Sequence, residues 1–364
     1  MAEITEKDVR ELNEEVKQID KELEELVTKQ KAKVKVFGVG GGGGNTLSRM
    51  REIGIKGAEF IGVNTDAQDL LYTNADAKIL IGKELTLGLG AGSNPNVGQE
   101  AAKESEHEIK QKLSGGDLVF ITCGLGGGTG TGAAPVIAEL AKKQGALTIA
   151  VVTLPFSIEG QKRWENALIG LEKLESCVDT LILIPNDKLL ELAPELPLHT
   201  AFKVADEILT NAVKGMTELI TKPGLVNLDF ADVKTIMVGG GVALIGMGES
   251  DSNNRAVEAV EKAIQNPLLD VDVSGATGAL VNIIGGPDLT LDETRKILEA
   301  INARLNPEAK LIWGAQLSED LDKSIRVMLI VTGVKSPQIV GSGDSNKNKK
   351  QKEISDELGI EFVE

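Results

Sequence analysis

A run of glycines and threonines, Cys123-Gly124-Leu125-Gly126-Gly127-Gly128-Thr129-Gly130-Thr131-Gly132, lies between a predicted strand and a predicted helix. The apolar stretch 117–122 before it is typical of a buried strand, and 135–141 after it has helical spacing. Glycines let the backbone curl so that several N–H groups face one anion, and a helix N-terminus adds positive potential. A tight turn alone would not need so many glycines. The sequence therefore predicts a phosphate site.

A second glycine run, Gly40–Asn45, follows the predicted strand 33–39 and precedes a helical pattern through Leu47 and Met50. Its spacing satisfies G-x-G-x-x-G, so an NAD(P)-dependent dehydrogenase must be weighed. Against this, the next strand ends in Asn64-Thr65-Asp66 rather than in one ribose-binding acid. Neither run continues into the Gly-Lys-Ser/Thr of a P-loop. Two loops for one ligand favour a longer phosphate chain, and hence a nucleoside triphosphate.

Strand and helix patterns alternate from residue 33 to about 185, which predicts a parallel sheet with helices on both faces and a ligand at the strands' carboxyl ends. A single long helix is expected over 200–221. Past it, two helical patterns and four strand candidates predict a smaller α+β unit, with the long helix bridging the two. The expected strands are 33–39, 59–63, 78–81, 117–122, 147–153, 180–184, 235–248, 278–285, 310–315 and 325–334, and the later helices 253–265 and 291–303.

Both ends of the chain differ from this core. Residues 4–30 carry an apolar stripe at heptad-type spacing, typical of an amphipathic helix that docks on its own domain or on a second copy. Its members are Val9, Leu12, Val16, Ile19, Leu23 and Leu26. The stretch 341–352 is a polar, lysine-rich linker, and 354–363 restores apolar residues, as a frayed terminus or a partner-docking peptide would.

Four blocks resemble the FtsZ family, the prokaryotic relatives of tubulin, in the family's order. They are Gly38–Asn45, Asn64–Gln68, the tubulin-type signature Gly126–Gly132 and Asn227-Leu228-Asp229-Phe230-Ala231-Asp232. The resemblance implies a Rossmann-like GTP-binding domain, a long central helix and a smaller α+β C-terminal domain. The implied divisions are an N-terminal helical extension (1–32), the GTP-binding domain (33–199), the central helix (200–221), the C-terminal domain (222–336) and a linker with a short tail (337–364).

The resemblance also implies which residues bind GTP or GDP. The nucleotide-binding positions that match the family are Gly41, Gly42, Gly43, Gly44, Asn45, Gly128, Thr129, Gly130, Glu159, Arg163 and Asp206. Asp206 would accept both donors of the guanine edge, and Glu159 and Arg163 would contact the ribose. Asn227, Asp229 and Asp232 would act on the nucleotide of the neighbouring copy in a head-to-tail filament. Mg²⁺ would be held mainly through the phosphates, and the sequence identifies no protein side chain as its ligand.

Composition narrows the possible partners. A net charge of −16 and an aromatic content of 3% disfavour nucleic acid and anionic lipid surfaces. The charged N-terminus does not fit a signal peptide, and no run is long enough to span a bilayer. Two cysteines fit a reducing compartment. Together with these exclusions, the FtsZ resemblance implies a cytoplasmic GTPase of the division ring at mid-cell, tethered to the membrane by a partner of its tail. The alternatives are the dehydrogenase and a nucleotide-binding structural protein whose hydrolysis has decayed.

Overall fold

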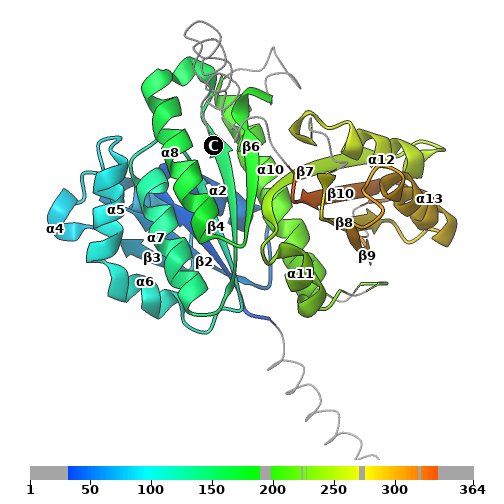
Figure 1. The fold of residues 1–364 in the computed structure, drawn as a ribbon, viewed down its shortest axis with the longest axis horizontal. Helices are drawn as coiled ribbons and strands as arrows, with labels where there is room; N and C mark the ends of the chain where they lie inside the picture. Colours follow the sequence, from blue (N-terminus) through cyan, green and yellow to red (C-terminus); the bar gives the residue numbers. More distant parts are fainter. Residues whose placement is uncertain are drawn as a thin grey trace, which may run out of the picture.

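The computed structural model describes residues 32–188, 198–222, 224–226, 228–269, 275–318 and 321–334. The predicted N-terminal helix, the linker, the tail peptide and Asn227 lie outside these ranges. Within them, one ten-stranded sheet runs in the order β3-β2-β1-β4-β5-β6-β7-β10-β8-β9. Figure 1 shows the sheet continuing from the blue-to-green half of the molecule into the yellow-to-red half.

The first six strands are all parallel, as the alternating pattern predicts. They are β1 (Val34–Val39), β2 (Ala58–Asn64), β3 (Ala77–Leu80), β4 (Leu118–Gly124), β5 (Leu147–Leu154) and β6 (Thr180–Pro185). The helices between them are α2 (Gly40–Glu52), α3 (Ala67–Tyr72), α4 (Lys83–Thr86), α5 (Pro95–Glu104), α6 (Glu106–Leu113), α7 (Thr129–Lys143) and α8 (Gln161–Cys177). A short 3-10 turn, Ser157–Glu159, precedes α8.

The C-terminal half is a mixed sheet of β7 (Gly241–Ser250), β8 (Gly278–Gly285), β9 (Lys310–Leu317) and β10 (Ile325–Thr332). Helices α12 (Arg255–Ile264) and α13 (Leu291–Asn302) cover one face. The other face packs against α10 (Leu198–Thr221), whose opposite side contacts the first sheet half. The predicted bridging helix is thus confirmed. The pairing of β6 with β7, which makes the sheet continuous, was not predicted.

Two local predictions were wrong. The strand expected over 235–248 begins only at Gly241, because Val233, Ile236 and Met237 bury one face of a helix, α11 (Phe230–Met237). Glycines at 239 and 241 with φ of +65° and +59° then turn the chain into β7. Likewise the glycines Gly40–Gly44 are the first turns of α2 rather than a loop.

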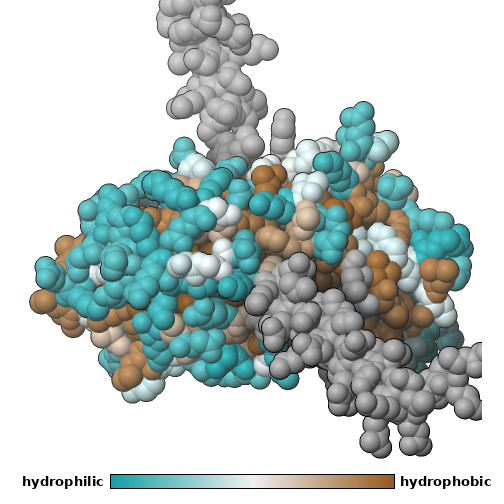
Figure 2. All heavy atoms as spheres, turned by 90° about the horizontal axis from the view of Figure 1, so that it is seen from below, coloured by the Kyte–Doolittle hydropathy of each residue, from teal (hydrophilic) through white to brown (hydrophobic). Residues whose placement is uncertain are grey.

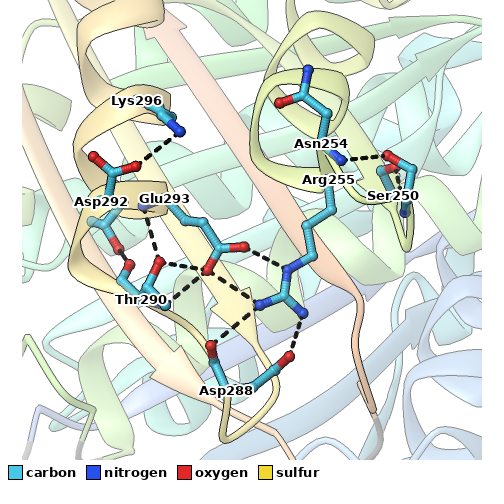
Figure 3. Close-up of polar contacts among 10 residues, drawn as sticks. Ser250, Asn254, Arg255, Asp288, Thr290, Asp292, Glu293 and Lys296 are labelled. Carbon is cyan, nitrogen blue, oxygen red and sulfur yellow. Dashed lines mark hydrogen bonds and ion pairs between the residues drawn. The ribbon is translucent and has the colours of Figure 1, made fainter.

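Polar side chains at the start of α13 bind α12 and the segment that precedes α13 (Figure 3). Arg255 is buried and its guanidinium binds Asp288 and both carboxylate oxygens of Glu293. Glu293 also accepts the backbone N–H of Thr290, whose hydroxyl oxygen accepts the N–H of Glu293, forming a capping box. The carboxylates of Asp288, Asp292 and Glu293 at this helix start are therefore all paired inside the fold.

Candidate functional site

A pocket of about 300 Å³ opens at the carboxyl ends of β1, β4, β5 and β6. Its floor is made by the starts of two helices: a Cβ placed on Gly40, the first residue of α2, would lie 2.9 Å from the backbone nitrogen of Gly130 in the first turn of α7. Neither helix has a side-chain cap or an acidic residue in its first turn. Their N–H groups are therefore free to bind an anion with the aid of both helix dipoles.

Most of the predicted nucleotide-binding residues line this one pocket. The lining includes Gly41, Gly42, Asn45, Gly128, Thr129, Gly130, Glu159, Arg163 and Asp206. These positions are far apart in the sequence, and the parallel sheet brings them together because successive strand ends share one edge. The convergence of two glycine-rich helix starts fits a chain of phosphates better than a single charged group.

Gly43 and Gly44 do not line the pocket. A Cβ on Gly43 would lie 2.5 Å from the backbone oxygen of Thr122, and one on Gly44 would lie 2.7 Å from the Thr73 hydroxyl. Gly43 therefore lets α2 pack closely against β4, which is a structural reason for a glycine that the motif itself did not separate from a ligand contact. Gly128 is similarly tight, because its Cβ would lie 2.7 Å from that of Ala91.

Asp206 lies on the pocket-facing side of α10, half buried, and its carboxylate accepts a hydrogen bond from the Thr46 hydroxyl at 2.8 Å. Burial raises the pKa of Asp206, and the Thr46 hydrogen bond and the charge of Arg49 act in the opposite direction. The Oδ2 atom of Asp206 has no hydrogen bond among the described residues. A ligand with two adjacent N–H donors could use both oxygens of this carboxylate.

Glu159 and Arg163 form an ion pair at the rim, with 3.0 Å between Nε and Oε2. Glu159 also accepts the backbone N–H of Phe156 at 2.8 Å. A Cβ on Gly126, whose φ is +100°, would lie 2.7 Å from Cγ of Arg163, so a glycine is required there for the arginine to lie across the loop. The pair is both an i,i+4 salt bridge and part of the pocket wall.

The pocket residues that the sequence reasoning missed include Phe202, Asn186 and Thr46. Phe202 contributes an exposed ring edge-to-face with Phe156, with 5.2 Å between the centroids. Asn186 follows β6 and is 4% exposed, and its Oδ1 atom has no hydrogen-bond partner in the described structure. Thr46 holds Asp206. Phe202 was counted only as part of an apolar helix stripe, and a lone Asn after a strand carries no sequence signal of its own.

Asp229 and Asp232 lie at the other end of the molecule, at the start of α11. The last turn of α11 touches the amino end of β6, where the Thr180 hydroxyl donates to the Met237 carbonyl. The pocket adjoins the carboxyl end of the same strand. Figure 1 likewise draws α11 toward the same end of the molecule as the point where the described chain enters β1. Both aspartates are exposed, and within the described ranges their carboxylates have no hydrogen-bond or ion-pair partner.

Comparison with known proteins agrees with this geometry. The family profile "Tubulin/FtsZ family, GTPase domain" matches residues 33–194, and "FtsZ family, C-terminal domain" matches 241–335. A cell division protein FtsZ 1 of Thermococcus kodakarensis is 63% identical over 322 residues, which cover 88% of this chain and 86% of the relative. The chain belongs to the FtsZ family. It is accordingly a GTP-binding and GTP-hydrolysing protein, and the dehydrogenase alternative is not supported.

Solved FtsZ structures match the whole described fold. A Methanocaldococcus jannaschii FtsZ is 58% identical over 329 residues, covering 90% of each chain. The structure titled "FtsZ dimer, empty (M. jannaschii)" superposes with a TM-score of 0.83 and 59% identity, covering 86% of this chain and 92% of that one. CetZ2 of Haloferax volcanii, at 21% identity and a TM-score of 0.73, shares the fold.

The FtsZ family resemblance implied Mg²⁺ held through phosphates. Among the described residues, no group of three or more His, Cys, Asp or Glu side chains could hold a metal ion. The pocket instead offers backbone N–H groups and hydroxyls, including the Thr129 hydroxyl, 2.6 Å from that of Thr65. The N–H groups can bind only the anionic oxygens of a ligand, whereas hydroxyl oxygens can also contact a cation. No helix of the described ranges combines the length and apolar character needed to cross a bilayer.

Proposed function

We propose that this FtsZ-family chain assembles head-to-tail into filaments of the division ring, and that each GTP is hydrolysed between two copies. One observation carries the proposal: the pocket lies at one end of the chain, and at the other lie the carboxylates of Asp229 and Asp232, which have no partner within the described ranges. The length of helix α10 gives the distance from the pocket to the opposite edge of the sheet. Its Asp206 lines the pocket, and its Thr221 lies beside Gly57, just before β2. Fifteen residues of helix span about 22 Å.

Within one copy, the pocket would hold the nucleotide. The N–H groups of Gly41, Gly42 and the Gly128–Gly130 turn would bind the phosphates, with Mg²⁺ neutralising part of their charge. Glu159 and Arg163 would contact the ribose. Asp206 would accept the two donors of guanine, and the ring of Phe202 would cover the base. Gly43 and Gly44 would contribute by positioning α2, and Asn45 would hold the base end of the ligand.

The next copy would complete the chemistry. In a stack of copies related by translation, the α11 end of one chain meets the pocket end of its neighbour. Asp229 and Asp232 could then orient a water molecule in line with the γ-phosphate and bind the associated cation, which is sufficient for phosphoryl transfer. Asn227, outside the described residues, would support the same loop. Cleavage would therefore require assembly.

The cellular role follows from the family and is also a proposal. The relatives that match most of this chain are named cell division proteins, so we propose a place in the division ring at mid-cell, on the cytoplasmic side of the membrane. A membrane-tethering division protein would bind the tail 354–363, where Ile360, Phe362 and Val363 offer an apolar anchor.

Complementation between two inactive variants tests the shared site. Asp232→Ala retains an intact pocket. In Gly127→Glu a carboxylate enters the phosphate space, where a side chain would meet no atom within 4 Å, and α11 is untouched. Gly127 suits this purpose better than Gly128, whose Cβ would strike Ala91. Mixed at equal concentration with GTP, the two variants should release phosphate faster than either alone.

Two results would contradict the proposal. One is a mixture that sediments as a copolymer and yet stays as inactive as its components. The other is a wild-type turnover per molecule that is constant down to concentrations at which no polymer scatters light. Gly127→Gln, which lacks the added charge, serves as the control for the loop itself and should bind GTP better than Gly127→Glu.

A further inference from the structure

Exposed apolar side chains are concentrated in one short part of the chain. Five residues between positions 71 and 89 are more than half exposed, and we call them the α3–α4 patch. They are Leu71 (70%), Tyr72 (77%), Leu85 (51%), Leu87 (77%) and Leu89 (83%). Figure 2 shows apolar side chains at the left-hand end of the molecule, where Figure 1 places α4. Contiguous exposed apolar surface marks an interaction site more often than scattered single residues do.

The two segments that carry these side chains lie side by side. The backbone N–H of Ala67 donates to the carbonyl of Gly88 at 2.9 Å, and Asp66 and Leu89 form an isolated β-bridge. The segment after α4 therefore lies along the start of α3, and Leu71 is one helical turn beyond Ala67 on the same face. The patch is thus formed by two adjacent segments rather than by separate loops.

Leu87 has an unusual backbone. Its φ of +53° places it in the left-handed region, which favours glycine or asparagine, and it is the residue that ends α4. A leucine here costs stability and also exposes an apolar side chain to water. Because the side chain is 77% exposed, contacts within the described fold offset little of this cost, which points to a contact outside it.

The patch lies at the pocket end of the molecule. Helix α3 follows the carboxyl end of β2, and α4 follows that of β3. Two residues beyond Leu89, Ala91 reaches the wall of the pocket, since a Cβ on Gly128 would lie 2.7 Å from its Cβ. In the proposed filament, this end faces the amino edge of the next copy's sheet. The patch is therefore continuous with the proposed contact.

We infer that the patch binds the N-terminal segment of the neighbouring copy, residues 9–26, through the apolar stripe of that segment. This inference rests on the proposed head-to-tail assembly. The segment joins the described chain at Ala32, just before β1, at the edge that faces the neighbour's pocket end. The six residues Val27–Ala32 span at most about 20 Å, enough to reach the neighbour's β2–β3 side.

A copy's own patch is harder for the same segment to reach. The segment starts at the amino end of β1, and the patch lies beyond the carboxyl ends of β2 and β3. A seven-residue strand such as β2 covers about 23 Å before any path around the surface is added. The neighbour's patch, in contrast, lies next to the proposed head-to-tail contact, where the segment starts. A clamp of this kind would add apolar contact area to the filament joint outside the catalytic groups.

Cross-linking of two full-length single-cysteine chains tests the inference directly. Cys177→Ser removes the partly exposed thiol, while Cys123 is fully buried, with the pKa of its thiol raised by burial to about 12, so it does not compete. Leu23→Cys and Leu87→Cys are then introduced in separate chains. Mixed with GTP under oxidation, they should form a disulfide-linked dimer. A mixture of Lys21→Cys, which at helical spacing lies opposite the stripe, and Leu87→Cys should form far less of it.

Assembly thresholds give a second readout. Leu87→Asn removes the apolar group and suits the left-handed backbone, so the fold should persist, and the critical concentration should rise by about tenfold. Leu291→Asn, at a leucine that is 83% exposed at the start of α13, is the matched control and should change nothing. Adding Ile19→Gln and Leu23→Gln to Leu87→Asn should raise the threshold no further, because the same contact is already lost.

Opposite outcomes overturn the inference. These are additive effects of the stripe and patch variants, or a disulfide that forms within one chain carrying both cysteines and not between chains. If wild-type protein assembles and hydrolyses GTP but no cross-link forms, only the clamp is wrong. If wild-type protein does not assemble with GTP, the head-to-tail contact and the clamp fall together.

Discussion

Two helix starts in the C-terminal half, those of α11 and α13, both carry two acidic residues but use them differently. At α13, Asp292 and Glu293 pair with Arg295, Lys296 and Arg255, so their charges are satisfied inside the chain. At α11, Asp229 precedes the helix without capping it, and Asp232 has no partner in the described ranges. A satisfied acidic helix start stabilises a fold, whereas an unsatisfied one is available for a ligand or a second copy.

Asp232→Ala is the strongest test of this difference. Removing a carboxylate that positions water or a cation should lower GTP turnover by about 100- to 1,000-fold while GTP affinity and assembly persist. Asp292→Ala, which removes an acidic residue from the first turn of α13, should keep wild-type turnover. Phosphate release at concentrations above the assembly threshold measures both, and equal losses in the two variants would remove any special role for α11.

Asp206 is a carboxylate of the pocket that, like those of α11, is expected to act on a ligand, here by recognising the base. Asp206→Asn cannot accept both guanine donors, so GTP affinity should fall by about 100-fold, with a much smaller change for ATP. Because burial raises the pKa of Asp206, its acceptor form is lost at a higher pH than for an ordinary aspartate. The wild-type preference for GTP should therefore weaken as the pH falls, and that of the variant should not. Binding titrations across pH would refute the assignment if both curves were parallel.

A smaller effect on GTP affinity is expected at the start of α7, which has no side-chain cap. Gly127→Ala adds one methyl group on the pocket wall where no atom lies within 4 Å, so the fold should be unaffected. GTP affinity should fall by about tenfold, because the methyl group competes for space with the phosphates. Gly275→Ala, also free of neighbours within 4 Å, is the control for a glycine substitution as such. Unchanged affinity would mean that this turn does not face the nucleotide.

The smallest effect is expected at α13. The Arg255 guanidinium, followed by the Thr290 hydrogen bonds, lowers the pKa of Glu293 to about 2 from an ordinary 4.5. This group therefore stabilises the fold fully above about pH 4.5, and the contribution disappears as the pH falls toward 2. Glu293→Gln should cost about 1 kcal/mol of unfolding free energy at neutral pH and nothing at pH 2. Denaturant unfolding at both pH values measures this, and GTP turnover should not change.

Local pattern was a reliable guide wherever one segment carries its own signal. The buried strands before each glycine run, the long helix that became α10 and the pocket residues on the two runs all follow from spacing and residue type. The strand expected over 235–248 failed because apolar residues at 233, 236 and 237 suit either a strand or a helix, and only packing against β8 and β9 selects the helix.

The sequence alone determined that this chain builds an anion site at the carboxyl edge of a parallel sheet, because glycine, hydroxyl and strand patterns act within a few residues. The sequence did not show that Gly43 packs against β4 whereas Gly42 lines the pocket. It also did not show that β6 pairs with β7. Only the tertiary structure placed Asp229 and Asp232 at the far end from that pocket. The reason is physical: which ends of distant segments meet depends on long-range packing, to which no local run of residues is sensitive.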